Sequence, residues 1–133
     1  MAVNITFQKL GPLKKRSEFL HVRNGRYKAQ GGLVVQSRKT PEDTIINGGA
    51  GIRVGFTATK KIGNAVVRNR AKRRMREVAR AVLGRHGRCG YDYVFIARNS
   101  TAHRAFDKLL SDGEKAVLSL SSNPDTHAQS NPR

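Results

Sequence analysis

The chain has 133 residues, with 26 Lys or Arg against nine Asp or Glu, a formal net charge of +17 and a pI near 11.3. That length fits one domain with a modest core, and so strong a self-repulsion favours a partner made of phosphates. No stretch is apolar enough to span a bilayer, which argues against a membrane partner. The single cysteine, Cys89, excludes an internal disulfide framework and predicts a reducing, cytoplasmic location.

The first residues predict an arm and a short helix. Residues 1–12 mix apolar and polar side chains without a period and close on Gly11-Pro12, which predicts a flexible N-terminal arm. Residues 13–24 predict a helix, for which Ser17 is the candidate cap and Asn24-Gly25 the stop.

Extended segments follow. The chain turns extended from Tyr27, and residues 33–36 predict a strand, with Gly31-Gly32 as a bulge or close approach at its start. This long extended run can also be split into two strands. Residues 38–50 are rich in turn residues and predict a polar hairpin loop. Residues 51–59 alternate, with Ile52, Val54, Phe56 and Ala58 on one side, which predicts a half-buried strand.

The stretch from residue 60 to residue 80 is the most one-sided in charge, with Lys and Arg throughout and a single acid, Glu77. Residues 60–63 predict a loop, and Asn64 is a plausible N-cap for a helix that ends before Gly84 or Gly87. One apolar stripe recurs at helical spacing: Val67, Ala71, Met75, Val78 and Val82. Two rows of cations flank it: Arg68, Lys72, Arg76 and Arg80 on one side, Arg70 and Arg74 on the other.

The last third predicts a central strand at residues 91–98, a turn, and a helix over residues 103–120. Residues 121–133 contain no core residues and are predicted to be disordered. The predicted domain therefore spans residues 13–120. Its fold class is α+β, with helices covering one face of a small mixed β-sheet.

Residues 60–74 read KKIGNAVVRNRAKRR, and this run resembles the signature of the bacterial ribonuclease P protein component. Three other segments are similar to family positions in the same order: residues 13–19 (LKKRSEF), residues 53–56 (RVGF) and residues 91–98 (YDYVFIAR). The resemblance implies the fold of the second domain of ribosomal protein S5, with a left-handed βαβ crossover. Pattern reasoning alone favours the right-handed sense.

The resemblance also implies a function. The family's protein is a subunit of a ribonucleoprotein that removes the 5′ leader from precursor tRNA, and the catalytic RNA with its bound Mg²⁺ performs the hydrolysis. One protein is expected per RNA subunit. The implied RNA-binding residues are Lys60, Lys61, Asn64, Arg68, Asn69, Arg70, Lys72, Arg73 and Arg76. The implied cleft for the single-stranded leader lies between the first helix and the sheet: Lys14, Lys15, Phe19, Arg23, Arg53, Phe56 and Ile96.

Two departures from the family pattern predict a more polar cleft, because Arg23 and Gln36 stand where aromatic residues are expected. For Asn69 two readings stay open, a hydrogen bond to ribose or base and one to the local backbone. The four histidines, His21, His86, His103 and His127, are scattered without metal-ligand spacing.

No catalytic group is predicted in the protein, and the acids Glu77 and Asp92 are expected in ion pairs with Arg. The alternative function is a ribosomal-type RNA-binding protein or RNA chaperone without a role in cleavage. A helix-turn-helix DNA binder is disfavoured, because no second helix lies a short turn before the basic one.

Overall fold

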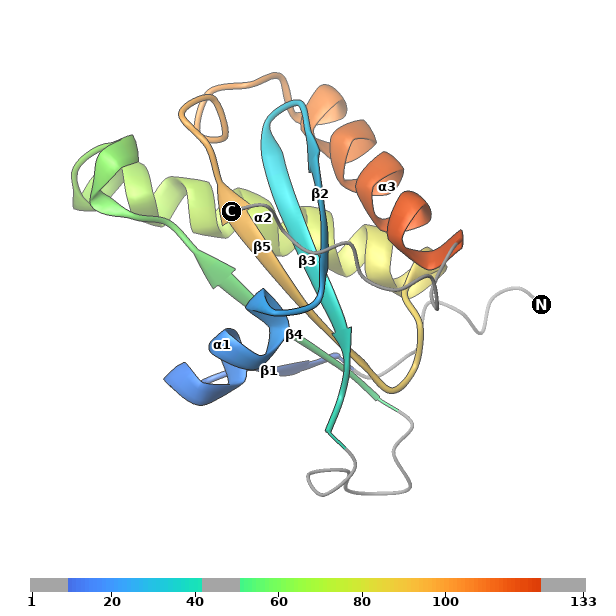
Figure 1. Ribbon diagram of the computed structural model, residues 1–133. Helices are drawn as coiled ribbons and strands as arrows, with labels where there is room; N and C mark the ends of the chain where they lie inside the picture. The colour runs from blue at the N-terminus through green and yellow to red at the C-terminus, as the bar shows by residue number, and fades with distance from the viewer. Residues whose placement is uncertain (1–9, 42–50, 123–133) are drawn as a thin grey trace.

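The computed structural model describes residues 10–41 and 51–122, which form a five-stranded mixed sheet with helices on both faces (Figure 1). The strand order is β1-β4-β5-β3-β2; β5 is central, parallel to β4 and antiparallel to β3. β1 is parallel to β4, and β2 is antiparallel to β3. The elements are β1 (Leu10–Pro12), α1 (Arg16–Arg23), β2 (Arg26–Gln30), β3 (Leu33–Lys39), β4 (Ile52–Thr57), η4 (Lys60–Ile62), α2 (Ala65–His86), β5 (Tyr91–Ala97) and α3 (Phe106–Ser122).

The β4–α2–β5 unit crosses over with left-handed sense. Its two strands are parallel neighbours. In Figure 1, α2 lies behind the sheet, and β5 lies to the right of β4 when both strands are followed toward their arrowheads. A right-handed unit seen from this side would carry its helix in front. The left-handed crossover that the family resemblance implied is therefore confirmed.

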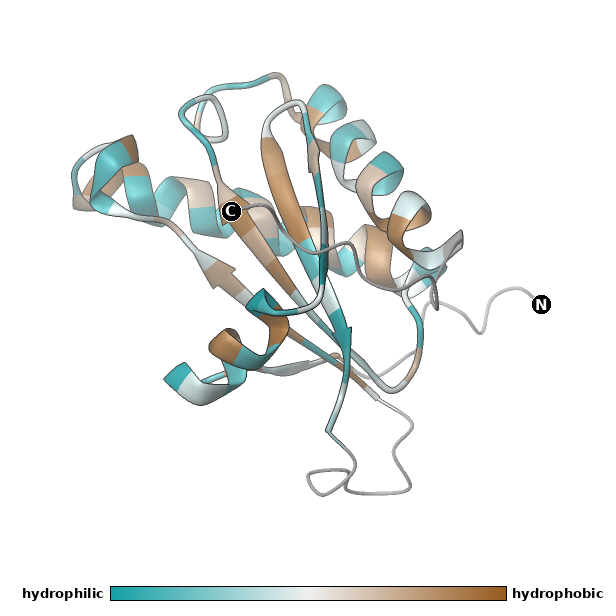
Figure 2. Cartoon of the chain, in the orientation of Figure 1, coloured by the Kyte–Doolittle hydropathy of each residue, from teal (hydrophilic) through white to brown (hydrophobic). Residues whose placement is uncertain are grey.

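The central strand is covered on both faces, as its apolar run predicted. Tyr93 and Phe95 join β3 and β4 in the main core under α2 and α3. Val94 points the other way and packs with Leu13 and Val22 beneath α1. The expectation that all helices cover one face is therefore wrong, because alternate residues of β5 build an apolar strip on each face. Figure 2 shows the hydrophobic residues concentrated along these strands.

The helix α2 buries the stripe predicted from the sequence. Ala71, Met75 and Val78 are fully buried, and the Asn64 Oδ1 atom accepts a hydrogen bond from the Val67 N–H at 3.0 Å, so the predicted cap is confirmed. A Cβ atom placed on Gly113 of α3 would overlap Cγ1 of Val78. Glycine at this position therefore lets α3 pack closely against α2.

Several predicted boundaries are corrected near the N-terminus. Residues 10–12 form the strand β1 rather than part of a flexible arm. Ser17 lies inside α1 and is not its cap. The start of the helix is held by Glu18 instead, whose Oε1 atom accepts hydrogen bonds from the N–H groups of Lys14 and Lys15. The Asn24-Gly25 stop is confirmed, since both N–H groups bond back to carbonyls of the last turn.

Further along the chain, Gly31 and Gly32 form the turn between β2 and β3, where Gly31 has a φ of +48°. The segment after β3 does not close a hairpin, because β5 lies between β3 and β4. Residues 60–62 form a 3₁₀ helix instead of a loop, and α3 begins at Phe106, later than predicted. Predictions for residues 1–9, 42–50 and 123–133, including the disordered tail and His127, lie outside the described residues.

Candidate nucleic-acid interface

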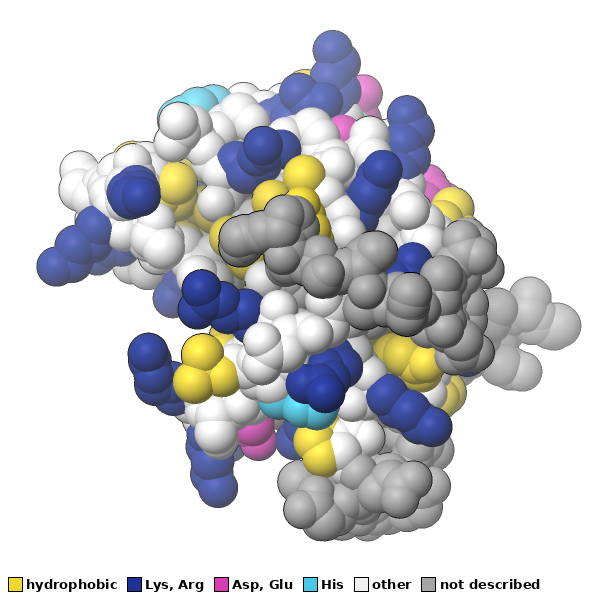
Figure 3. All heavy atoms as spheres, in the orientation of Figure 1, with side chains coloured by type: hydrophobic (Ala, Val, Ile, Leu, Met, Phe, Trp, Pro, Cys, Tyr) yellow, Lys and Arg dark blue, Asp and Glu magenta, His cyan; other side chains and the backbone are white. Residues whose placement is uncertain are grey.

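The first half of α2 and the 3₁₀ helix before it present cations without acidic partners. Within the described residues, none of these cations forms a salt bridge with an Asp or Glu. Each is exposed or half-exposed: Lys60, Lys61, Arg68, Arg70, Lys72, Arg73 and Arg76. We call this set the α2 cation surface. Figure 3 shows Lys and Arg side chains spread widely over the molecule, with few acids among them on the face in view.

One flank of α2 runs along β4. The Arg76 guanidinium lies over the ring of Phe56, 5.8 Å from its centroid, and a nitrogen of Arg68 donates to the Gly63 carbonyl at 3.4 Å. Neither contact uses more than part of a guanidinium, so both side chains keep donors for a phosphate. Asn69 is exposed, and its side-chain amide makes no hydrogen bond within the described residues, which leaves that amide available to a partner.

The other flank of α2 holds the loop between β5 and α3. Nε of Arg70 donates to the Ala102 carbonyl at 2.7 Å, which leaves its two terminal nitrogens outside that bond. Arg74 donates through both terminal nitrogens, to the carbonyls of Thr101 at 2.7 Å and Arg104 at 2.5 Å. Burial and the neighbouring charge of Arg70 lower the pKa of Arg74. Arg74 therefore anchors the loop, whereas Arg70 both anchors it and faces outward.

The aromatic residue of α1, Phe19, packs directly on the sheet. A Cβ atom on Gly55 would lie 2.5 Å from Cζ of Phe19, so the ring occupies the space that this glycine leaves open. Beyond α1, strand register places the half-buried residues Thr57, Ile96 and Val34 in one row across β4, β5 and β3. This row forms a strip beside Phe19. The surface in Figure 3 is indented on the left, between the start of α2 and α1.

Not every residue predicted for the cleft lies on this side. Lys14, Lys15 and Arg23 are exposed on or beside α1, and Phe19 and Ile96 share one cluster. Phe56 faces the opposite side of the sheet, where its ring centroid lies 5.9 Å from that of Phe95. Its place in the predicted cleft is therefore wrong, because strand alternation turns it toward α2.

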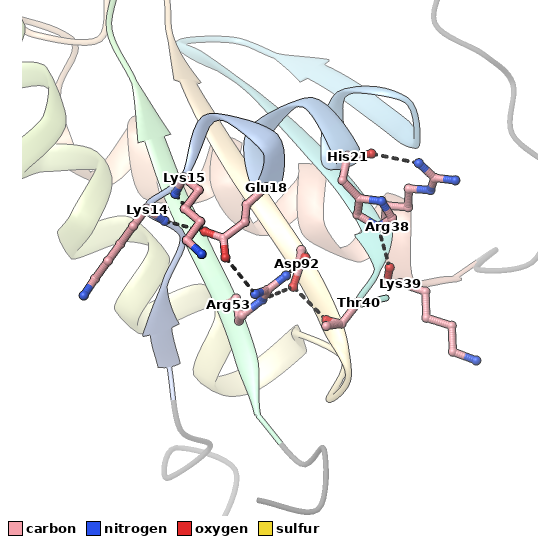
Figure 4. Close-up of polar contacts among 9 residues, drawn as sticks. All are labelled: Lys14, Lys15, Glu18, His21, Arg38, Lys39, Thr40, Arg53 and Asp92. Atoms are coloured by element: carbon pink, nitrogen blue, oxygen red, sulfur yellow. Dashed lines mark hydrogen bonds and ion pairs between the residues drawn. The ribbon is translucent and has the colours of Figure 1, made fainter. Parts of the chain in front are cut away.

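Arg53 is on the α1 side, but its charge is already engaged. Its guanidinium bonds to Asp92 at 2.6 and 2.8 Å and to Glu18 at 3.2 Å (Figure 4). The ion pair predicted for Asp92 is therefore confirmed. The one predicted for Glu77 is confirmed as well, with Arg80 at 3.5 Å.

In the described part of the chain, no three His, Cys, Asp or Glu side chains are grouped so that they could hold a metal ion. The same part contains no helix with the length and apolarity needed to cross a membrane. His86 forms a pair with Glu114 at 3.0 Å, and the ring of His21 bonds to the Lys39 carbonyl at 2.9 Å. The described site therefore offers positive charge, with the half-buried ring of Phe19 beside the cations of α1.

Residues 7–121 match the model of the family described as Ribonuclease P. The chain belongs to the ribonuclease P protein family. It is 52% identical to the ribonuclease P protein component of Ruegeria pomeroyi over 109 residues, which cover 81% of this chain and 84% of that protein. It is 41% identical to the protein component of Paramagnetospirillum magneticum over 125 residues, which cover 93% and 92%.

Solved structures of ribonuclease P proteins agree with the fold. The protein from Staphylococcus aureus aligns with a TM-score of 0.63 and 27% identity, covering 80% of this chain and 91% of that one. The protein from Thermotoga maritima aligns with a TM-score of 0.60 and 28% identity, covering 78% and 96%. Partnership with the ribonuclease P RNA follows from membership of this family.

Sequence reasoning missed two features of this ribonuclease P protein. The anchoring role of Arg74 was signalled only by its position four residues after Arg70, on the flank away from Arg68. The role of Glu18 was signalled by its place three residues after Lys15, the spacing at which an acid accepts from the N–H groups at a helix start. Glu18 engages the guanidinium of Arg53, and the loop carbonyls engage that of Arg74.

Proposed function

We propose that this chain is the protein subunit of a ribonuclease P ribonucleoprotein that removes the 5′ leader from precursor tRNA. The α2 cation surface carries the proposal: seven cations in one region of a ribonuclease P protein have no acidic partner among the described residues. Like charges at such spacing repel, and a phosphate backbone relieves that repulsion. We assign this surface to the catalytic RNA.

Hydrolysis is assigned to the RNA subunit. Phosphodiester cleavage needs ordered metal ions or an acid–base pair. The acids nearest the signature are Glu77 and Asp92, and both bind arginines. The described side chains therefore do not fit an Mg²⁺ site, and we place the Mg²⁺ on the RNA. The protein contributes positive charge, which favours a folded RNA and its substrate.

The α1 side is assigned to the leader. Phe19 stands beside the row formed by Thr57, Ile96 and Val34, and stacking of a base on an aromatic ring tolerates many sequences. Lys14, Lys15 and Arg23 supply charges around it. Because α1 and α2 lie on opposite faces of the sheet, one protein can hold catalytic RNA and leader together. We expect one protein per RNA subunit, acting in the cytoplasm.

The test is cleavage of precursor tRNA by a matching RNA subunit across a series of Mg²⁺ concentrations. Adding the chain should lower the Mg²⁺ required, and the gain should be larger for a leader of several nucleotides than for a single nucleotide. Phe19→Ala should reduce that leader-dependent gain. The matched control is Phe106→Ala, because Phe106 is a partly exposed aromatic on α3, across the sheet from α1.

Three results would contradict the proposal. One is cleavage by the chain without RNA, and another is a gain independent of leader length. The third is equal stimulation of an unrelated structured RNA, which would favour a general RNA chaperone.

A further inference from the structure

Arg53 joins three segments that are distant in the sequence. Its guanidinium binds Asp92 of β5 through two nitrogens, at 2.6 and 2.8 Å, and Glu18 of α1 through a third, at 3.2 Å. Figure 4 shows the three side chains converging between α1 and the sheet. Arg53 itself comes from β4, so one cation ties two strands of the sheet to the helix above them.

The two carboxylates are also held from other sides. The Asp92 side chain is fully buried, and its Oδ1 atom accepts a hydrogen bond from the Thr40 hydroxyl at 2.7 Å. Glu18 accepts from the Lys14 and Lys15 N–H groups at 2.7 and 2.9 Å. These N–H groups, first that of Lys15, together with Arg53 lower the pKa of Glu18, and Asp92 raises the pKa of Arg53. Every member of the group therefore has a fixed geometry.

The other end of α1 is tied independently. The His21 ring bonds to the Lys39 carbonyl at 2.9 Å, and Arg38 donates to the His21 carbonyl at 3.0 Å (Figure 4). Phe19 lies between the two attachments, with its ring against Gly55. Contacts at both ends of α1, a helix of eight residues, therefore fix the distance of Phe19 from the sheet.

The local charge argues against a direct role for Arg53 in binding phosphate. One guanidinium faces two carboxylates, so the group of Glu18, Arg53 and Asp92 carries a net charge of about −1. A leader phosphate brought to Arg53 would have to displace one of these carboxylates or approach both. The cations beside this group, Lys14 and Lys15, form no close ion pair with an acid among the described residues.

We propose that Glu18 and Arg53 are positioning residues for leader binding, which hold Phe19 and the backbone of Lys14 and Lys15 at the correct height, while Arg53 makes no contact with the leader. The inference rests on the proposed function, because it concerns the same leader surface. It replaces the role that the family resemblance implied for Arg53.

A leader-binding role and a positioning role predict opposite effects of Glu18→Ala on the affinity for the leader. If Arg53 bound the leader, Glu18→Ala would remove a competing carboxylate and tighten leader binding. If Glu18 positions α1, the same change loosens the helix start and weakens leader binding, although the net charge becomes more positive. The matched control is Glu114→Ala, which removes an acid of the same type from α3, where it pairs with His86.

The experiment uses the holoenzyme reconstituted with its RNA subunit, and precursor tRNAs with a long leader or a single leader nucleotide. Glu18→Ala should raise KM for the long-leader substrate roughly tenfold, within the range expected for loss of one base–aromatic stack. It should leave kcat, the KM for the short-leader substrate and the Kd for the RNA subunit unchanged. Glu18→Gln, which keeps the acceptor for Lys14 and Lys15, should lose less.

A second variant covers the case in which Glu18→Ala fails to fold. Arg53→Ala/Asp92→Ala removes the cation without leaving a buried carboxylate unpaired. It should raise KM for the long leader with an unchanged salt slope, whereas loss of a direct single-strand phosphate contact reduces the magnitude of the slope by about 0.7. A smaller slope, or tighter leader binding in Glu18→Ala, would overturn the inference.

Equal losses for both substrates would also overturn it, because they would indicate general damage to the fold. The failure of the two proposals can be told apart. A wild-type holoenzyme without any leader-dependent gain would refute the proposed function. If the wild-type holoenzyme shows the leader-dependent gain, and Glu18→Ala and Glu114→Ala change that gain equally, only the positioning role is refuted.

Discussion

The α2 cation surface and the surroundings of Arg53 are both rich in arginine, but they handle charge in opposite ways. On α2, cations such as Arg68 and Arg73 have no acid within salt-bridge distance among the described residues. At Arg53, a single cation meets two carboxylates. The cations of the first region carry positive charge that no acid in the described part of the fold neutralises. The charge of Arg53 is neutralised within the fold. The difference indicates that an arginine's own contacts, more than the local density of Lys and Arg, decide how much of its charge is left unpaired.

The salt dependence of RNA binding is the strongest test of this comparison. If about five to seven of the α2 cations contact phosphates, the log–log slope of RNA-subunit affinity against salt should be about −4.5 to −6.3. Affinity should then fall by about a thousandfold between 50 and 200 mM salt. Arg68→Ala should reduce the magnitude of the slope by about 0.9, and Arg53→Ala/Asp92→Ala should leave it unchanged. Filter binding over a salt series measures both, and a slope near zero would refute the α2 assignment.

The free energy of unfolding should distinguish a substitution of Arg53 from one of Arg68. Arg53→Ala leaves the buried Asp92 carboxylate without its cation and should cost about 3–5 kcal/mol of unfolding free energy. Arg68→Ala should change stability by less than about 0.5 kcal/mol, but it should weaken RNA binding by about 1.5–3 kcal/mol.

Urea unfolding and RNA titration of the same two variants test this contrast. The double variant Arg53→Ala/Asp92→Ala serves as control and should recover part of the lost stability, because no buried charge is then left unpaired. A stable Arg53→Ala protein with weak RNA binding would contradict the comparison.

Within α2 itself, Arg73 and Arg74 should differ although they are neighbours. Arg74 donates to the carbonyls of Thr101 and Arg104, so Arg74→Ala should cost about 1.5–3 kcal/mol of stability. Arg73 is exposed, and Arg73→Ala should lower RNA affinity with little change in the thermal midpoint. The measurement is thermal unfolding beside RNA binding, and equal behaviour of the two variants would count against the anchoring role.

The smallest effect is expected from the titration of Glu18. The pKa of this carboxyl is lowered in the folded chain from its ordinary value of 4.5, first by the Lys15 N–H and then by that of Lys14. The folded state therefore binds the proton less readily than the unfolded state. Stability from Glu18 is present above about pH 4.5 and is lost as pH falls through the lowered value.

Glu18→Gln lacks this group, so its unfolding midpoint in urea should fall less than that of the wild type between pH 6 and pH 3. The difference between the two proteins isolates Glu18 from the other acids. Identical pH profiles would show that Glu18 contributes nothing through its charge.

Local features were predictable from the sequence. The stripe on α2 and the Asn64 cap are confirmed, because helical spacing and capping depend on residues within a turn of each other. The central position of β5 was signalled by its continuous apolar run. The left-handed crossover was not accessible to pattern reasoning, and it came from the family resemblance alone.

Long-range choices were not predictable from local signals. The segment after β3 contains turn residues, but turn residues do not tell which strand pairs with β3, and that strand is β5. Arg53 was assigned to the leader because its partners, 35 and 39 positions away, are not visible beside it. The wrong placement of Phe56 could have been avoided, because it lies on the same face of its strand as Ile52 and Val54. That face points away from Phe19.

The position of β5 in the sheet also has a consequence for biosynthesis. It pairs with both β3 and β4, yet it is the last of the described strands to be made. While the ribosome extends the chain, the β2–β3 pair and β4 therefore wait with unpaired edges until residue 97 has emerged. The basic helix α2 emerges before β5 as well, so its apolar stripe has no central strand to pack on during the same interval.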